Sequence, residues 1–256
     1  MITVPKEHFN LMKKKIEEAP TFVFSLLDST IKGTVLADST NYKSFLFQTD
    51  SGLYYVAGQL PDELFLKNLV SVFEASVNKG KRFTLFSPTP AWNQAIENHF
   101  DKRVRKIQRY AFSFDLITYK NRKRNEINEY NVIKINQYLI EHCLEFDKKY
   151  YDEYWGSVGN FLGNGIGFCV KVKEKIISEV VSIFKSNNYA EIDITTDLSY
   201  RGKGLASIVA EKFIDYCLSE NIQPRWDCDV DNSASINLGS KLGFINPIKY
   251  SIYTKL

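Results

Sequence analysis

The chain has few metal-binding or redox-active side chains, and those it has are scattered. Its histidines and cysteines are His8, His99, His142, Cys143, Cys169, Cys217 and Cys228. No two of them have the C-x-x-C or H-x-x-x-H spacing of common metal and redox motifs. We therefore expect no metal site, and we expect the thiols to stay free in a reducing cytosol.

The chain also lacks a long apolar run and a strong excess of one charge. No apolar run approaches the about 18 residues of a membrane span, and the N-terminal segment 1–20 has no apolar signal-peptide core. The net charge is +3, from 33 basic and 30 acidic residues, which is too small to indicate nucleic acid by itself. We expect a cytoplasmic protein, a monomer or homodimer, with no membrane and no nucleic-acid partner.

What is present suits a packed interior. The 256 residues are 44% hydrophobic and 14% aromatic, enough for one large domain or two small ones. Segment 118–130, TYKNRKRNEINEY, is polar and has no apolar periodicity over its first residues. It predicts an N-terminal α/β domain over 1–120 and a second domain over 127–256. Its basic run (Lys120, Arg122, Lys123 and Arg124) is interpreted as a solvated loop, with phosphate binding as the alternative.

The second half alternates between strand and helix patterns. Strands are expected at 129–135, 165–172, 176–184, 189–197, 225–230 and 248–256, and helices at 136–155, 204–221 and 232–244. The order β-α-β-β-β-α-β-α-β predicts an α/β (α+β) fold, a mixed sheet flanked by helices.

The first half follows a similar plan. Helices are expected at 6–18, 61–80 and 91–100, and strands at 22–27, 33–38, 44–49, 53–58, 82–88 and 109–117. Both halves end in the same strand-helix-strand pattern, so the first half is hypothesised to be a degenerate copy of the second. It has Pro61 and Asp62 before its long helix, where the second half has a glycine-bearing turn, and so it is not expected to bind a ligand in the same way.

That turn lies in DLSYRGKGLAS, residues 197–207. Glycine at a strand-to-helix turn lets backbone approach a ligand, and the following helix offers unpaired N–H groups and a positive dipole end. With Arg201 and Lys203 this pattern indicates an anion site, the alternative being a tight turn capped by glycine. It fits neither the Walker nor the dinucleotide fingerprint.

Two separated motifs carry a family resemblance. RGKGLA, with Arg201, Gly204 and Ala206, fits R/Q-x-x-G-x-G/A, and NSASINLGSKLGF (232–244) fits N-x-x-A/S ending in K-x-GF. These motifs and the order of elements over 127–256 resemble the GNAT superfamily of N-acetyltransferases. More narrowly, the chain looks like the bacterial acetyltransferases related to zwittermicin A resistance.

The resemblance implies acetyl-CoA as co-substrate and a small-molecule amine as acceptor. Loop amides of 202–206 would hold the pyrophosphate, backbone groups of Ile194 and Thr196 would pair with the pantetheine arm, and a backbone N–H near Thr195 or Thr196 would stabilise the oxyanion. Asn232 and Ser235 would line the thioester end. The predicted coenzyme site is therefore Ile194, Thr195, Thr196, Arg201, Gly202, Lys203, Gly204, Leu205, Ala206, Asn232 and Ser235.

The catalytic groups follow less directly. Glu191 and Asp193 alternate onto one face of their strand and are candidate general bases, with Glu179 on the neighbouring strand as a further candidate. Gly239 stands where many superfamily members carry a tyrosine, so the general acid must be another group: Tyr250, Tyr253, Cys228 or water. Of these Tyr253 is taken as the candidate catalytic residue. An acyl-enzyme at Cys228 is disfavoured because no histidine partner is evident.

Segments 148–155, KKYYDEYW, and 159–168, GNFLGNGIGF, fall where this superfamily places acceptor-binding elements. They are read either as the wall of a small-molecule pocket or as core packing and a turn. The leading function is acetyl transfer to a small amine. The alternatives are a non-catalytic acyl-CoA sensor, an aminoacyl transferase of the cell-wall precursor type and, more weakly, a nucleic-acid-binding protein.

Overall fold

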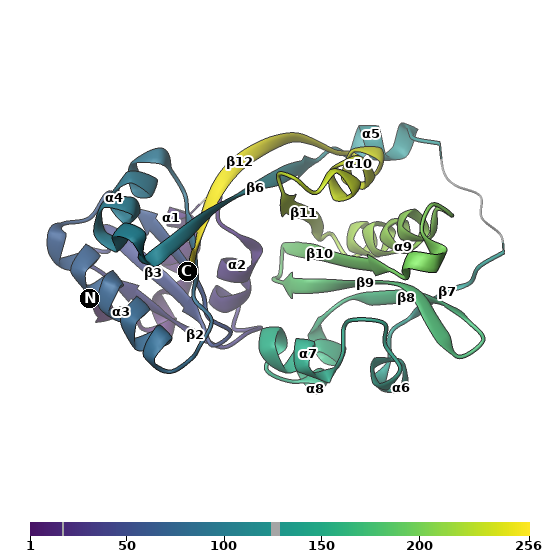
Figure 1. The fold of residues 1–256 in the computed structure, drawn as a ribbon, viewed down its shortest axis with the longest axis horizontal. Coiled ribbons are helices and arrows are strands. Elements are labelled where there is room, and N and C mark those ends of the chain that lie inside the picture. The colour runs from purple at the N-terminus through teal and green to yellow at the C-terminus, as the bar shows by residue number, and fades with distance from the viewer. Residues whose placement is uncertain (17, 124–128) are drawn as a thin grey trace. The chain divides into compact units, whose positions relative to one another are not determined.

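The computed structural model describes residues 1–16, 18–123 and 129–256 (Figure 1). The chain divides into two compact units. The first unit comprises Met1–Tyr110 together with Lys249–Leu256, and the second comprises Ala111–Ile248. This division differs from the boundary expected at 118–130, because the last residues of the chain belong to the first unit.

The first unit is a mixed sheet with helices. Its strands are β1 (Ile2–Thr3), β2 (Gly33–Ala37), β3 (Ser44–Thr49), β4 (Leu53–Gly58) and β5 (Thr84–Ser87), followed in space by β12 (Phe244–Lys255). Neighbouring strands are antiparallel except β4 and β5, which are parallel. The helices are η1 (Lys6–His8), α1 (Phe9–Lys15), α2 (Thr21–Leu27), α3 (Glu63–Asn78), α4 (Pro90–Phe100) and η2 (Asp101–Arg103).

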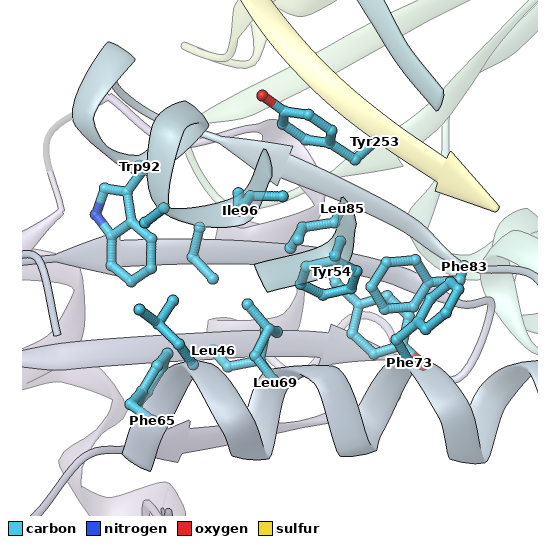
Figure 2. Close-up of a cluster of buried hydrophobic side chains, with 14 residues drawn as sticks. Leu46, Tyr54, Phe65, Leu69, Phe73, Phe83, Leu85, Trp92, Ile96 and Tyr253 are labelled. Carbon is cyan, nitrogen blue, oxygen red and sulfur yellow. The ribbon is translucent and has the colours of Figure 1, made fainter. Parts of the chain in front are cut away.

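Aromatic side chains fill a core of this unit (Figure 2). Phe65, Leu69 and Phe73 recur along one face of α3, the spacing of an amphipathic helix. They pack with side chains of β3, β4, β5 and α4, and with Tyr253 of β12. The last strand of the chain is thus part of this core.

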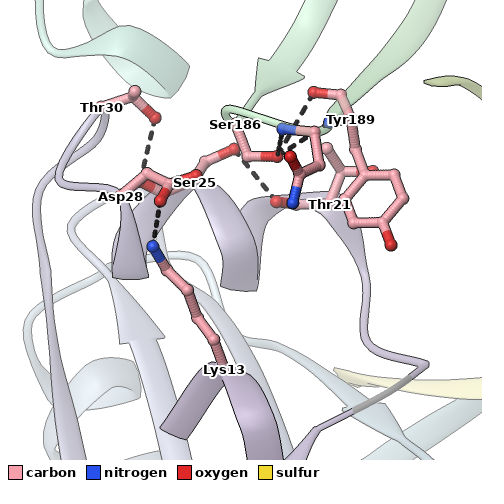
Figure 3. Close-up of polar contacts among 8 residues, drawn as sticks. Lys13, Thr21, Ser25, Asp28, Thr30, Ser186 and Tyr189 are labelled. Carbon is pink, nitrogen blue, oxygen red and sulfur yellow. Dashed lines mark hydrogen bonds and ion pairs between the residues drawn. The ribbon is translucent and has the colours of Figure 1, made fainter. Parts of the chain in front are cut away.

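Residues 22–27 were expected as a strand, and that prediction is wrong. They form α2, in which every residue from Thr21 to Leu27 is buried. A short apolar run does not distinguish a buried strand from a helix that is buried all round. Three local contacts pair polar groups in and around the helix: the Ser25 hydroxyl donates to Thr21 O at 3.0 Å, the Thr30 hydroxyl donates to Ser25 O at 2.9 Å, and Lys13 pairs with Asp28 (Figure 3).

The second unit has the order expected from the sequence, and the predicted fold class is confirmed. Its strands are β7 (Val132–Lys134), β8 (Gly167–Val172), β9 (Lys175–Lys185), β10 (Tyr189–Thr196) and β11 (Gln223–Asp229). Strand β6 (Val104–Phe114) begins in the first unit and ends in the second. Its helices are α5 (Leu116–Asn121), α6 (Gln137–Glu141), α7 (Lys148–Trp155), α8 (Val158–Asn164), η3 (Leu198–Tyr200), α9 (Leu205–Ser219) and α10 (Ser233–Lys241).

Strands β7 to β10 are antiparallel, and β10 and β11 are parallel, joined through α9. Helix α9 packs on β8, β9, β10 and β11, while α6, α7 and α8 form a separate core with side chains of β8 and β9.

The helix expected over 136–155 is broken into two helices, α6 and α7. His142 ends α6, and Asp147 begins α7 with a side-chain cap on Tyr150 N.

The polar segment 118–130 is partly structured. Its first residues belong to α5, and the Arg122 side chain is largely buried, with its guanidinium 3.5 Å from the centre of the Tyr119 ring and 3.3 Å from a Glu211 carboxylate oxygen. The prediction of a solvated basic loop is therefore wrong for Arg122, which binds α5 to α9. Arg124 lies outside the described residues.

The two units repeat one plan. Each has three antiparallel strands, a helix, a parallel strand, and a second helix: β2-β3-β4-α3-β5-α4 in the first and β8-β9-β10-α9-β11-α10 in the second. The repeated order is the pattern behind the hypothesis of internal duplication, and the duplication itself stays a prediction. The strand that pairs with β5 is β12, through residues Ser251 to Thr254, which belong to the first unit although they come last in the sequence.

Candidate functional site

Strand β10 leaves its parallel neighbour halfway along its length. The register with β11 runs from Tyr189↔Gln223 to Glu191↔Arg225. On its other edge β10 stays paired with β9 to Thr196↔Ser178, with a bulge between Glu191 and Ile192. A bulge bends a strand and increases its twist, so it accounts for the end of the parallel register at this point. The later part of β10 holds the predicted residues Ile194, Thr195 and Thr196, all partly buried.

Side-chain contacts hold the turn that follows β10 in place. Asp197 accepts a hydrogen bond from Ser199 N at 2.9 Å and pairs with Lys175 at 2.6 Å, which holds the pKa of its carboxyl below the ordinary value. Arg201 donates from Nε to Thr196 O at 3.2 Å, and Lys203 lies 4.8 Å from the centre of the Tyr200 ring. Both cations are thus attached to the ends of the turn and are exposed.

Two glycines shape the turn itself. Gly202 and Gly204 have φ values of +76° and +79°, which L side chains rarely adopt. Gly204 is the N-cap of α9 and provides no side-chain cap, whereas the caps of α3, α4, α7, α8 and α10 each accept from a backbone N–H. Leu205 is buried at the start of α9, and Ala206 follows it. The helix start is therefore left without a capping oxygen, the arrangement that suits an anion.

Asn232 and Ser235 lie at the start of α10. The Asn232 side-chain oxygen accepts from Ser235 N at 3.0 Å and caps the helix. The Ser235 hydroxyl accepts from the indole nitrogen of Trp226 at 3.1 Å. Both residues therefore have structural roles that leave the Asn232 amide N–H groups and the Ser235 hydroxyl hydrogen available for a ligand.

The Trp226 indole also accounts for the glycine at 239. A Cβ built on Gly239 would lie 3.0 Å from Trp226 Nε1 and 3.2 Å from Cδ1. The indole, which is buried, takes the space that a larger side chain at 239 would need. Sequence reasoning found the departure at 239 but missed its cause, because nothing in the spacing of Trp226 and Gly239 indicates that they touch.

Glu191 and Asp193 share the face of the sheet that α7 covers. Asp193 is in register with Val181, a residue of the core formed with α7, and Glu191 is in register with Phe184, whose ring packs edge-on against Tyr154. Asp193 Oδ2 accepts a hydrogen bond from the Tyr150 hydroxyl at 2.9 Å. Sequence reasoning did not single out Tyr150, although the aromatic run 148–155 had marked its segment.

Glu179 has a structural role. It is 1% exposed, and its Oε1 accepts from Glu145 N at 2.7 Å and Phe146 N at 3.1 Å, which anchors the connection between α6 and α7. Burial raises the pKa of its carboxyl, and the backbone hydrogen bonds oppose that rise. The buried Glu179 side chain therefore holds the connection between α6 and α7 in place.

The two candidate tyrosines of the last strand lie in the first unit. Tyr253 is buried in the core shown in Figure 2, and its hydroxyl donates to Glu97 Oε1 at 2.7 Å. Burial, followed by the contact with Glu97, raises its pKa far above the ordinary value. Tyr250 accepts from Arg109 Nε at 3.1 Å. Tyr253 therefore belongs to a different unit from Glu191 and Asp193. Cys228, the remaining protein candidate, is buried and forms no disulfide.

The aromatic side chains of α7 fall into two groups. Tyr151 and Trp155 point into the core, where the Tyr151 ring centre lies 4.2 Å from that of Phe161. Tyr150 and Tyr154 pack on each other with ring centres 4.9 Å apart and border that core. Segment 159–168, for which a pocket wall and core packing with a turn were the two interpretations, forms most of α8 and the start of β8.

In the first unit, side chains and their hydrogen bonds occupy the region that corresponds to the glycine turn of the second unit. Asp62 caps α3 by accepting from Phe65 N at 2.9 Å, so a carboxylate occupies the helix start. At the start of α4, the buried Trp92 donates from its indole nitrogen to Gly58 O, at the end of β4, at 3.3 Å. These contacts fill the positions that correspond to the glycine turn and the strand end of the second unit.

No helix among the described residues is long and apolar enough to cross a membrane. Within residues 1–16, 18–123 and 129–256, no three His, Cys, Asp or Glu side chains gather in a way that could hold a metal ion.

Comparison with known proteins gives concordant matches. A model of the GNAT acetyltransferase family matches residues 11–253. The uncharacterized N-acetyltransferase YdfB of Bacillus subtilis (strain 168) is 39% identical over 252 residues, which cover 97% of this chain and 96% of that protein.

Solved structures agree in fold. A GCN5-related N-acetyltransferase-like protein from Streptococcus suis 89/1591 is 25% identical, with a TM-score of 0.73 and coverage of 98% of this chain and 99% of that one. A tandem GNAT protein from the clavulanic acid biosynthesis pathway is 11% identical, with a TM-score of 0.62 and coverage of 99% and 97%. Both matches cover nearly the whole chain, so the likeness in fold includes both units.

Proposed function

Because the chain belongs to the GNAT acetyltransferase family and is an N-acetyltransferase, we propose that it moves an acetyl group from acetyl-CoA to the amine of a small molecule, antibiotic-like or metabolic. The family generally uses acetyl-CoA as co-substrate. The narrower relation to zwittermicin A resistance acetyltransferases, and a role in the bacterial cytoplasm as a monomer or homodimer, belong to the same proposal.

The observation that carries the proposal is the glycine turn beside the end of the β10–β11 register. Backbone N–H groups of Gly202, Lys203, Gly204, Leu205 and Ala206 form the proposed pyrophosphate site, at the positive end of the α9 dipole. Arg201 and Lys203 add cationic charge at its edge. The open backbone positions at the two glycines allow a diphosphate to approach closely.

The pantetheine arm then extends along β10 beyond Glu191. Backbone groups of Ile194 and Thr196 pair with its amides, as a peptide adds to a strand edge. Thr196 O already accepts from Arg201 and has a second lone pair to offer. A backbone N–H at Thr195 or Thr196 stabilises the oxyanion, a contribution typically worth about 3 kcal/mol.

Asn232 and Ser235 line the thioester end with the hydrogen-bonding capacity that their structural contacts leave over. The C–N bond forms as the neutral amine attacks the acetyl carbon, and the C–S bond breaks as the intermediate collapses. Positioning of the amine against the thioester supplies much of the rate in such a transfer. The thiolate takes a proton from water or from the attacking nitrogen, because Tyr253 is in the core of the first unit.

Glu191 and Asp193 are the proposed bases on the acceptor side. They lie on the α7-covered face of β10, and Glu179 on β9 is excluded from the role by its two backbone contacts and its burial. Two carboxylates beside the aromatic rings of Tyr150 and Tyr154 suit an acceptor that arrives as an ammonium ion.

The proposal is tested with two matched glycine variants. Gly204→Glu places bulk and negative charge in the pyrophosphate site and should abolish calorimetric binding of coenzyme A. Gly80→Glu is the control, because Gly80 also has a positive φ, +63°, with no atom within 4 Å of its built Cβ, and it lies at the end of α3 in the first unit. It should bind coenzyme A normally.

Activity is followed as free thiol released from acetyl-CoA with a panel of primary amines. Equal binding by a folded Gly204→Glu variant contradicts the site. Binding of coenzyme A without turnover of any amine favours the acyl-CoA sensor, and transfer from an aminoacyl-tRNA favours the cell-wall type of transferase.

A further inference from the structure

A tyrosine of α7 holds one of the two candidate bases. The Tyr150 hydroxyl donates to Asp193 Oδ2 at 2.9 Å, across from a helix to a strand 43 positions apart in sequence. Because a hydrogen bond to the ionised form of a carboxyl favours that form, this contact stabilises the Asp193 carboxylate. It also fixes the direction of the Oδ2 oxygen.

Tyr150 is suited to remain a donor. Burial, and then the negative charge of Asp193, raise the pKa of its hydroxyl well above the ordinary value. The hydroxyl therefore keeps its proton at any pH at which an acetyltransferase works. Its backbone is held as well, because Tyr150 N donates to the Asp147 cap at 3.0 Å.

The helix that carries Tyr150 is rigidly placed. Tyr151 and Trp155 anchor α7 in the core, the Trp155 indole donates to Ser182 O at 3.1 Å, and Gly156 ends the helix with a φ of +74°. An aromatic side chain on a helix so fixed can hold a partner within the narrow geometry that proton transfer requires.

We propose that Tyr150 is a positioning residue that keeps the Asp193 carboxylate ionised and aimed at the ammonium group of the acceptor. This inference rests on the proposed acetyl transfer. One proton passes from the ammonium to Asp193 and then to solvent, which leaves a neutral amine to attack. The second proton leaves the nitrogen as the intermediate collapses and ends on the departing sulfur, so the step balances.

Other titratable groups face Asp193 and will couple to it. In the second unit they include Tyr150 and Tyr151 of α7, Glu179 of β9 and Glu191 of β10, and Arg225 of β11 is in register with Glu191. The experiment therefore compares variants rather than interpreting one absolute midpoint.

The chain offers a matched control in the next residue. Tyr151 is buried on the same helix, and within the described residues its hydroxyl has no hydrogen-bond partner. Tyr150→Phe and Tyr151→Phe thus remove the same atom from neighbouring positions, and only the first removes a contact with Asp193.

The first measurement needs no acceptor. Carboxyl ¹³C shifts of the full chain, labelled at aspartate, are followed with pH, and the Asp193 signal is assigned by its absence in Asp193→Asn. Tyr150→Phe should raise the Asp193 midpoint by about one pH unit, and Tyr151→Phe should leave it in place. An unmoved midpoint in folded Tyr150→Phe overturns the inference.

The second measurement uses acetyl-CoA and the best acceptor from a panel of cadaverine, tyramine, lysine and kanamycin. Tyr150→Phe should move the acidic limb of the pH profile upward and lower kcat about tenfold, less than the hundredfold or more expected for Asp193→Asn. The Kd for coenzyme A should not change. If the acidic limb of the pH profile does not move in Tyr150→Phe, the inference is also overturned. If no amine in the panel is acetylated, the result counts against the proposed function, and the ¹³C titration of Asp193 alone decides whether Tyr150 is a positioning residue.

Discussion

Trp226 occupies the space beside Gly239, because a Cβ added to that glycine would lie only 3.0 Å from the indole nitrogen. The same nitrogen donates to the Ser235 hydroxyl at 3.1 Å, so the ring is held between two residues of α10. The buried indole fixes the start of the helix that carries Asn232.

We expect Gly239→Ala to destabilise the protein, although alanine normally favours a helix. The new methyl must displace the indole or its helix, and such overpacking costs about 1–3 kcal/mol. Urea unfolding gives the free energy, and tryptophan fluorescence reports the ring. Ser240→Ala, on the next residue, removes an exposed hydroxyl bonded back to Ile236 O and should be nearly neutral. If Gly239→Ala has a higher free energy of unfolding than the natural protein, the indole can move aside without a loss of stability.

Glu179 should make stability depend on pH. Its folded pKa is raised, so its contribution is fully present below its ordinary value of 4.5 and is lost as pH rises through the folded value. Glu179→Gln keeps an oxygen for Glu145 N and Phe146 N and removes the buried charge. The variant should therefore gain stability relative to the natural protein between pH 5 and pH 8, by about 1 kcal/mol or more.

Glu179→Ala supplies the contrast for that experiment. It leaves two backbone donors unpaired and should lose about 2 kcal/mol or more at both pH values. If Glu179→Gln and the natural protein change in parallel with pH, the carboxyl does not titrate differently in the folded state.

Tyr253→Phe should weaken the first unit and spare acetyl transfer. It removes the donor to Glu97 Oε1 in a buried core, which costs about 1–2 kcal/mol. Contacts with Lys106 and then Tyr253 hold the pKa of Glu97 below 4.5, so the difference between variant and natural protein should shrink as pH falls below that value.

Lys106→Met tests the other partner of Glu97. Its ion pair is 2.9 Å long but lies near the surface, so its loss should cost well under about 1 kcal/mol. A tenfold fall in kcat for a fully folded Tyr253→Phe would restore Tyr253 as a catalytic candidate.

One coenzyme A should bind per chain. The first unit repeats the plan of the second, but Asp62 caps the helix at the corresponding turn and Trp92 bonds to Gly58 O at the corresponding strand end. Calorimetric titration gives the stoichiometry, and two equivalents bound with similar affinity would show that the first unit opens.

The sequence predicts the second unit well where its signals are local. The alternation at 189–197, the glycines at 202 and 204 and the amphipathic segment after them are all visible in the residue pattern, and they place β10, the turn and α9 correctly. Their chemistry is carried by the backbone, which a short motif specifies.

Features that depend on distant contacts were missed. Residues 22–27 were assigned to a strand because their burial on all sides is a tertiary property. Arg122 was assigned to a solvated loop because Tyr119 and Glu211 lie nearby only in the folded chain. The Tyr150–Asp193 and Trp226–Gly239 contacts join separate elements and leave no periodic trace.

The position of the last strand limits how this protein can be divided. A fragment that stops at 120 would present β5 without β12, leaving a row of backbone donors and acceptors open to foreign chains. It would also lack Tyr253, which is part of the aromatic core of the first unit. The first unit therefore depends on residues that follow the whole second unit in sequence, so a single cut between the units cannot release both intact.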